Sequence, residues 1–162
     1  MQQRFIFLLG SNVGDRPAQL AAAQEGLVRL VGPIDKQSSI YETAAWGKTD
    51  QDPFLNQIVS GTTLLDPESV MKAALQVETE MGRTRSRKWE PRTIDIDLLF
   101  LEQVVMHSDL LVLPHPMLHQ RKFTLAPLCD IFPEFRHPVL GKTMKELLEE
   151  LSDPLEVKPY RP

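Results

Sequence analysis

Two aspartates, Asp95 and Asp97, carry the strongest chemical signal in this sequence, and they lie inside residues 93–101, which read as a strand. Side chains at positions i and i+2 of a strand point to the same face, so we expect the Cβ atoms of the two aspartates about 6.5 to 7 Å apart. The apolar residues of the same strand are then expected in the core on the opposite face: Ile94, Ile96, Leu98 and Phe100.

Two carboxylates on one face predict a divalent-cation site. Like charges this close repel unless a cation lies between them, and carboxylate oxygens favour Mg²⁺ or Ca²⁺ over softer metals. Mg²⁺ is the better candidate, because it binds through one or two carboxylates and completes its shell with water and substrate phosphates.

A cluster of basic residues directly precedes this strand. The chain has a formal net charge of -4, yet five cations fall within residues 83–92, with Glu90 as the one acid among them. The cations are Arg83, Arg85, Arg87, Lys88 and Arg92. Because such a concentration of charge repels itself unless an anion binds to it, the cluster beside the aspartates indicates a polyphosphate substrate.

Each half of this motif also has a simpler interpretation. An Asp-x-Asp pair on a strand is often a solvated outer face, and a basic run is more often an exposed loop than a binding site. The adjacency of the two halves favours phosphate binding over two unrelated surface features.

A glycine-containing segment, residues 10–14, follows the apolar run 5–9 and precedes a helix start at Asp15 and Pro17. This order invites a phosphate-loop interpretation, but the Lys-Ser/Thr ending of a Walker motif and the G-x-G-x-x-G pattern are both absent. We therefore expect a tight turn that closes the helix against the sheet.

The composition is that of one ordinary globular domain over residues 1–162, with 42% hydrophobic and 25% charged residues. No segment resembles a signal peptide or a membrane span, so we expect a cytoplasmic protein without a membrane partner, acting as a monomer. A single cysteine, Cys129, forms no internal disulfide and is expected to be a small core residue. The acidic pI of about 5.6 argues against a general nucleic-acid binder.

The order of the elements predicts the fold. Strands are expected at residues 5–9, 34–43, 54–64 and 93–101, and helices between the first two strands and, from Asp66, between the last two. The order strand, helix, strand, strand, helix, strand predicts a ferredoxin-like α+β fold, an antiparallel sheet with helices on one face. Two further helices are expected at residues 125–132 and 144–151, followed by a loose tail from Pro154.

Residues 87–98, Arg-Lys-Trp-Glu-Pro-Arg-Thr-Ile-Asp-Ile-Asp-Leu, closely resemble the signature of the 6-hydroxymethyl-7,8-dihydropterin pyrophosphokinases of folate biosynthesis. The likeness spans nearly the whole chain, with Glu90 as a departure where family members commonly have glycine. The resemblance implies transfer of pyrophosphate from ATP to the hydroxymethyl group of the dihydropterin, with release of AMP. It also implies two Mg²⁺ ions held by Asp95 and Asp97.

The resemblance further implies roles for residues along the chain. Arg83 and Arg92 would offset charge on the transferring group and on the leaving AMP. The implied nucleotide-binding residues are Glu78, Arg85, Trp89, His115 and Arg121. The implied pterin-binding residues are Thr43, Trp46, Phe54, Asn56, Trp89 and Phe123, although Phe54 also suits the core, and Trp46 is our candidate in a segment that departs from the family.

A nucleic-acid-binding module is the alternative, because ferredoxin-like sheets also bind RNA through exposed aromatics and a basic loop. Trp89 among the arginines would then stack on a base. Against it, Asp95 and Asp97 would repel an RNA backbone, and the strands show no RNP-like aromatic pattern. A Mg-ATP analogue should raise the melting temperature of the enzyme, and single-stranded RNA that of the module.

We expect Arg83→Ala and Arg92→Ala to lower turnover more than ATP affinity, because charge at the bridging phosphate oxygens grows toward the transition state. Arg92→Lys should restore little of the loss, since lysine cannot make the bidentate contact. Steady-state kinetics with ATP as the varied substrate measures both effects. If the variants raised only the Michaelis constant for ATP, these arginines would bind ATP in the ground state without stabilising the transition state further.

Overall fold

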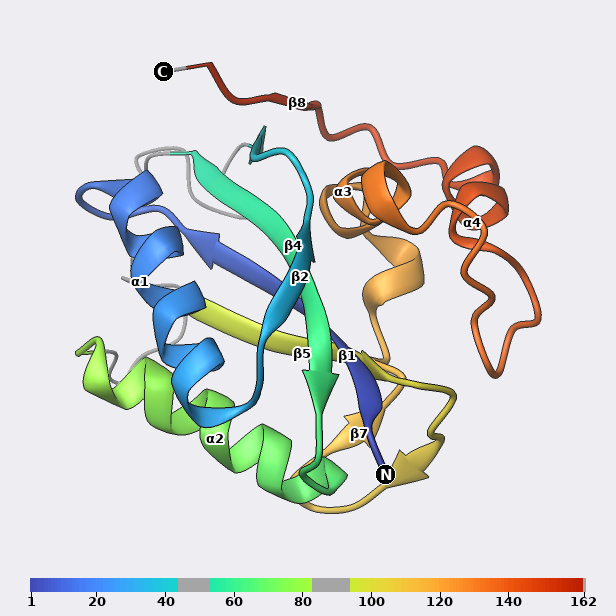
Figure 1. Ribbon diagram of the computed structural model, residues 1–162. Helices are drawn as coiled ribbons and strands as arrows, with labels where there is room; N and C mark the ends of the chain where they lie inside the picture. Colours follow the sequence, from blue (N-terminus) through green and yellow to red (C-terminus); the bar gives the residue numbers. More distant parts are fainter. Residues whose placement is uncertain (44–52, 83–93, 162) are drawn as a thin grey trace.

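The computed structural model describes residues 1–43, 53–82 and 94–161, and its centre is an antiparallel sheet (Figure 1). The strands of this sheet are β1 (Gln3–Ser11), β2 (Ile34–Gln37), β3 (Tyr41–Thr43), β4 (Phe54–Thr63), β5 (Asp95–Leu101) and β8 (Val157–Pro159). They are ordered β5-β1-β4-β3-β8, and β2 also pairs with β4. Because β5 and β4 flank β1 and the next strand lies beyond β4, the sheet has the ferredoxin-like order that the sequence predicted.

The helices cover both faces of the sheet. Helices α1 (Arg16–Leu30) and α2 (Pro67–Glu80) lie on one face, and α3 (Lys122–Ile131) and α4 (Met144–Glu150) on the other (Figure 1). The shorter elements are the hairpin of β6 (Met106–His107) with β7 (Val112–Leu113), and the 3-10 helix η1 (Leu118–Gln120). No helix in the described parts of the chain is long and apolar enough to cross a membrane.

The prediction that helices cover one face was therefore incomplete, and β1 shows why. Residues 5–9 are all buried, with Phe5, Phe7 and Leu9 in the core toward α1 and α2. Ile6 and Leu8 belong to a second hydrophobic cluster that includes residues of α3 and α4. An apolar strand without alternation needs cover on both sides, and the two C-terminal helices supply the second cover. Cys129 lies half-buried at the edge of this second cluster.

Helix starts follow the predicted capping pattern. The Asp15 carboxylate accepts a hydrogen bond from the backbone N–H of Ala18 at 3.2 Å, and Asp66 accepts one from Ser69 at 2.8 Å. Each cap satisfies an N–H that the helix itself cannot pair, which stabilises it by about 1 kcal/mol.

Three local predictions were wrong. The expected strand 34–43 is two strands, since Ser38 turns its hydroxyl to the backbone N–H of Ile58 at 2.9 Å and interrupts the pairing. Gly10 and Ser11 belong to β1 rather than to a turn. The tail from Pro154 is not wholly loose, because β8 pairs with β3. Each of these outcomes depends on a partner strand distant in sequence.

We expect Gly61→Ala to destabilise the protein by about 3 kcal/mol or more, the upper end of overpacking costs. A Cβ at Gly61 would lie 1.8 Å from the Pro33 carbonyl oxygen and 2.8 Å from Cζ of the buried Phe5. Urea unfolding measures the loss. Thr62→Ala, at a half-buried neighbour in the same strand, is the control and should cost less than about 1 kcal/mol; equal losses would contradict the steric argument.

Candidate active site

A row of four residues crosses the sheet from β5 to β3. The antiparallel register places Asp95 opposite Gly10, Gly10 opposite Asn56, and Asn56 opposite Tyr41. Residues directly opposite one another point to the same face of a sheet. Leu8, which is opposite Asp97, lies in the cluster with α3 and α4. The two aspartates and Asn56 therefore share the face that these C-terminal helices partly cover.

The two aspartates share a face as predicted, but the apolar residues of β5, together with Ile94 just before it, divide between faces. Ile94, Ile96 and Leu98 lie in the core toward α1 and α2, whereas Phe100 lies in the second cluster. The reason is a register shift, since Ile6 pairs with Phe100 while Phe7 pairs with Leu98. The extra residue between these pairs is a bulge, which reverses the alternation beyond it.

Gly10 makes room for the Asn56 side chain. A Cβ at position 10 would lie 2.9 Å from Asn56 Oδ1 and 3.9 Å from Cδ1 of Phe54. Asn56 is only 5% exposed. Because Gly10 has no side chain, there is space for the buried Asn56 amide, with Asp95 on one side of it and Phe54 on the other.

Thr43 completes this end of the sheet. It is paired with Phe54 across β3 and β4, and its hydroxyl is buried without a hydrogen-bond partner in the described residues. Buried hydroxyls are usually paired, so an unsatisfied one beside a cluster of this kind indicates a ligand. Thr43, Phe54 and Asn56, which the resemblance assigned to the pterin, are brought together on one face.

Asp95 and Asp97 are half-buried and suit Mg²⁺. The described residues contain no group of three or more His, Cys, Asp or Glu side chains that would hold a metal by themselves. Mg²⁺ sites in proteins commonly take one or two carboxylates from the chain and their further ligands from water and substrate phosphates. The donor set of this face therefore fits the ion.

Glu78 supports the strand that carries both aspartates. It is 3% exposed in α2, and its Oε2 accepts a hydrogen bond from the backbone N–H of Ile96 at 2.7 Å. Ile96 lies between Asp95 and Asp97, so this charge-assisted bond holds the backbone from which both carboxylates project. Direct contact of Glu78 with the nucleotide stays a prediction.

His115 is held in one tautomer. Its backbone N–H donates to the carbonyl of Leu99 at 3.0 Å, and its Nδ1 accepts from the backbone N–H of Met117 at 3.2 Å. An accepting Nδ1 places the proton of the neutral ring on Nε2. Burial, and to a lesser extent the Arg121 guanidinium, lowers the pKa of His115 to about 4. His115 is thus a neutral hydrogen-bond donor near pH 7.

Arg121 and Phe123 lie at the start of α3. The Arg121 guanidinium lies 5.5 Å from the centre of the Phe123 ring, within range of a cation–π contact. Phe123 is half-buried against the cluster that contains Leu8. The remaining predicted site residues lie outside the described parts of the chain: Trp46, Arg83, Arg85, Trp89 and Arg92.

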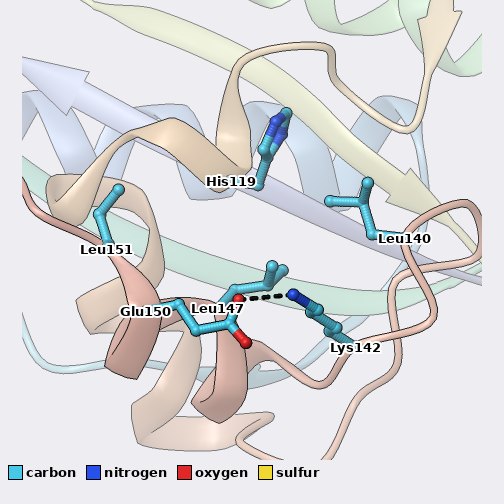
Figure 2. A pocket seen from close by; sticks show the side chains of 6 residues that line it. All are labelled: His119, Leu140, Lys142, Leu147, Glu150 and Leu151. Carbon is cyan, nitrogen blue, oxygen red and sulfur yellow. Dashed lines mark hydrogen bonds and ion pairs between the residues drawn. The ribbon is translucent and has the colours of Figure 1, made fainter.

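A separate hollow lies between η1 and α4 (Figure 2). It is lined by His119, Leu140, Lys142, Leu147, Glu150 and Leu151. The Lys142 ammonium and the Glu150 carboxylate pair across its rim at 2.7 Å. None of the predicted site residues that the structure describes lines this hollow, so it is distinct from the row on the sheet.

Sequence reasoning missed the polar contact that ties α3 to the sheet. The Tyr41 hydroxyl donates to Asp130 Oδ1 at 2.6 Å, and the Ser39 N–H donates to Asp130 Oδ2 at 3.1 Å. Burial and the Asp130 carboxylate raise the pKa of Tyr41 to about 12. The partners are about ninety residues apart in the chain, so no local pattern predicts them.

Comparisons with known proteins point to one family. Residues 6–133 match the family model of 7,8-dihydro-6-hydroxymethylpterin-pyrophosphokinase (HPPK). A 2-amino-4-hydroxy-6-hydroxymethyldihydropteridine pyrophosphokinase of Methylorubrum extorquens is 43% identical over 88% of this chain and 90% of its own length. One from Aquifex aeolicus is 42% identical over 88% of both chains.

Solved structures show the same fold. A crystal structure of an HPPK-DHPS protein in complex with substrates superposes with a TM-score of 0.73 at 15% identity, covering 92% of this chain and 43% of that one. A Plasmodium falciparum HPPK-DHPS structure gives a TM-score of 0.74 at 17% identity, covering 93% and 45%. This chain therefore spans less than half the length of those proteins.

The pKa of His115 predicts a specific pH dependence of stability. The unfolded imidazole takes up a proton near its ordinary pKa of 6.5, but the folded one does so only near 4, so between these values the unfolded state binds more protons. Stability should therefore fall as the pH drops through this window, and His115→Gln should make the slope shallower. The lowered pKa of His137 keeps part of the slope in the variant. Urea unfolding at several pH values measures the slopes, and an NMR titration of the His115 ring with a midpoint near its ordinary value would contradict the assignment.

Proposed function

Because this chain belongs to the 7,8-dihydro-6-hydroxymethylpterin-pyrophosphokinase family and is thus a pyrophosphokinase of folate biosynthesis, we propose a division of labour among its residues. The reaction transfers the pyrophosphoryl group of ATP to the hydroxymethyl group of 6-hydroxymethyl-7,8-dihydropterin and releases AMP. None of the comparisons supports the nucleic-acid-binding alternative.

The observation that carries the proposal is the row in which Gly10 separates Asn56 from Asp95 on one face of the sheet. Asn56 offers both a donor and an acceptor to the polar edge of a pterin. The unsatisfied Thr43 hydroxyl lies at the same end of β4 and gives the heterocycle another polar partner. The hydroxymethyl group would then face the carboxylates, where the phosphates bind.

Aromatic side chains complete the pterin site. Phe54 and Phe123 are half-buried, so each leaves part of its ring for a flat ligand. Trp46 and Trp89, outside the described residues, are proposed to cover the ring as well. Stacking between aromatic faces suits a planar heterocycle better than an aliphatic pocket does.

Asp95 and Asp97 are proposed to hold two Mg²⁺ ions together with the phosphates of ATP. When bound, Mg²⁺ offsets the negative charge of the phosphate oxygens and aligns the β-phosphorus. Glu78 keeps the backbone between the two aspartates in place through its bond to Ile96. The carboxylates thus project from a strand that is held on the α2 side as well as by β1.

The remaining residues orient and neutralise the reacting groups. The hydroxymethyl oxygen attacks the β-phosphorus in line, the bond from that phosphorus to the α-bridging oxygen breaks, and the hydroxyl proton is released. His115 would donate from Nε2 to a phosphate oxygen without adding a charge, while Arg121 adds one. Arg83, Arg85 and Arg92 are proposed to offset charge on the transferring group and on AMP.

A product assay tests this function. The protein is incubated with Mg-ATP and 6-hydroxymethyl-7,8-dihydropterin, and the nucleotides are separated. AMP formed in equal amount with the pterin diphosphate supports pyrophosphate transfer, whereas ADP with a monophosphate ester would overturn it.

We expect Asp97→Asn to lower turnover by about 10³-fold or more, because a metal ligand that acts on the transition state is lost. The metal-free variant should be as stable as the parent or slightly more so, since the repulsion between two carboxylates on one face is reduced. Steady-state turnover and urea unfolding without Mg²⁺ measure these two effects, and calorimetry of nucleotide binding with and without Mg²⁺ measures the metal dependence of binding.

Asp109→Asn, at an exposed aspartate before β7, is the matched control and should change neither quantity. Nucleotide binding by the parent that ignores Mg²⁺, or a near-normal rate in Asp97→Asn, would place the metal elsewhere.

A further inference from the structure

One arginine joins the two strands that present the pterin-binding side chains. Arg16 is the first residue of α1, and its Nη1 donates to Glu42 Oε2 at 2.9 Å and to the carbonyl oxygen of Pro53 at 2.7 Å. Glu42 directly precedes Thr43 in β3, and Pro53 directly precedes Phe54 in β4. A single guanidinium therefore bridges the two strands next to the Thr43–Phe54 pair.

The surroundings of Arg16 restrict its position. Its guanidinium lies 5.5 Å from the centre of the Tyr160 ring, a cation–π distance. Tyr160 is itself fixed, because its backbone N–H donates to the carbonyl of Ile40 at 2.8 Å. The side chains of Arg16 and Glu42 are 20% and 24% exposed, so solvent screens this pair less than a surface ion pair. These neighbours therefore restrict the Arg16 guanidinium to the position in which it bridges the two strands.

We propose that Arg16 is a positioning residue for pterin binding, an inference that rests on the proposed function of Thr43, Phe54 and Asn56. Strand β3 is only three residues long and ends at Thr43, so its pairing with β4 and β8 constrains the Thr43 side chain less than a position in the middle of a long strand would be constrained. Arg16 adds a charge-assisted contact on the α1 side, which fixes the distance between the strands beside the buried Thr43 hydroxyl. Side chains that orient a ligand need support of this kind to hold their geometry.

The experiment compares ligand affinities of variants by calorimetry, with 6-hydroxymethyl-7,8-dihydropterin and a non-hydrolysable ATP analogue in the presence of Mg²⁺. Arg16→Ala should raise the Kd for the pterin about tenfold, by analogy with the low end of the loss when a residue that orients a metal ligand is removed. The Kd for the ATP analogue should change less than about twofold. Glu42→Ala should raise the pterin Kd by a smaller factor, because the contact of Arg16 with Pro53 remains.

The double variant Arg16→Ala/Glu42→Ala should be no worse than Arg16→Ala, since both changes remove one interaction. Arg4→Ala is the matched control, because Arg4 makes an ion pair with Asp35 at 2.9 Å at the other end of the sheet. It should lower the melting temperature and leave the pterin Kd unchanged.

Three results would overturn the inference: an unchanged pterin Kd in Arg16→Ala, equal losses for both ligands, or the same pterin loss in Arg4→Ala. If Arg16→Ala does not fold, Glu42→Ala decides by the same criteria. Failure of the unmodified protein to bind the pterin would instead refute the proposed function itself, and the inference with it.

Discussion

The pairing of β1 with a neighbour on each side is the constraint on which the site depends. Gly10 lies between Asp95 of β5 and Asn56 of β4 because both pairings are antiparallel, with the register to β4 running along all nine residues of β1 and the register to β5 from Phe5 to Gly10. A slip of one residue in either register would move the carboxylates or the amide to the other face of the sheet. Such a slip is disfavoured because it would turn the polar Asn56, Asp95 and Asp97 side chains toward the apolar core under α1 and α2.

The helix starts and the shared face of the two aspartates could be predicted because the sequence patterns that indicate them are local. Alternation in β5 placed Asp95 and Asp97 on one face, and the caps at Asp15 and Asp66 marked the helix starts. Such patterns depend on residues two to four positions apart, which the sequence displays directly. The pterin-binding role of Asn56 stays a prediction, made because an amide in the middle of a strand needs a partner.

The features that sequence reasoning missed depend on contacts between distant segments. Phe100 changes face because of a bulge opposite β1, and the tail becomes a strand because β3 leaves an edge for it. The role of Gly10 cannot be predicted from its local sequence, because the reason for a glycine at this position is the Asn56 side chain of the neighbouring strand. In each case the partner strand, and not the local propensity, decides the conformation.

Three polar contacts around the row each hold one element of the fold to another. Glu78 holds β5 through Ile96, Arg16 holds β3 to β4, and Asp130 holds α3 to β3. A carboxylate near the C-terminus of α2 is disfavoured by the helix dipole and by burial, so Glu78 is a costly residue at its position.

A cost of this kind is tolerated where the contact supports a site, because a polar bond is stronger and more directional in a low-dielectric surrounding than apolar packing. Apolar packing is non-directional, whereas a charge-assisted hydrogen bond is short and directional and so resists a shift of the strand. The hydrophobic clusters thus determine that the sheet forms, and the three polar contacts determine how accurately its polar face is presented to two substrates.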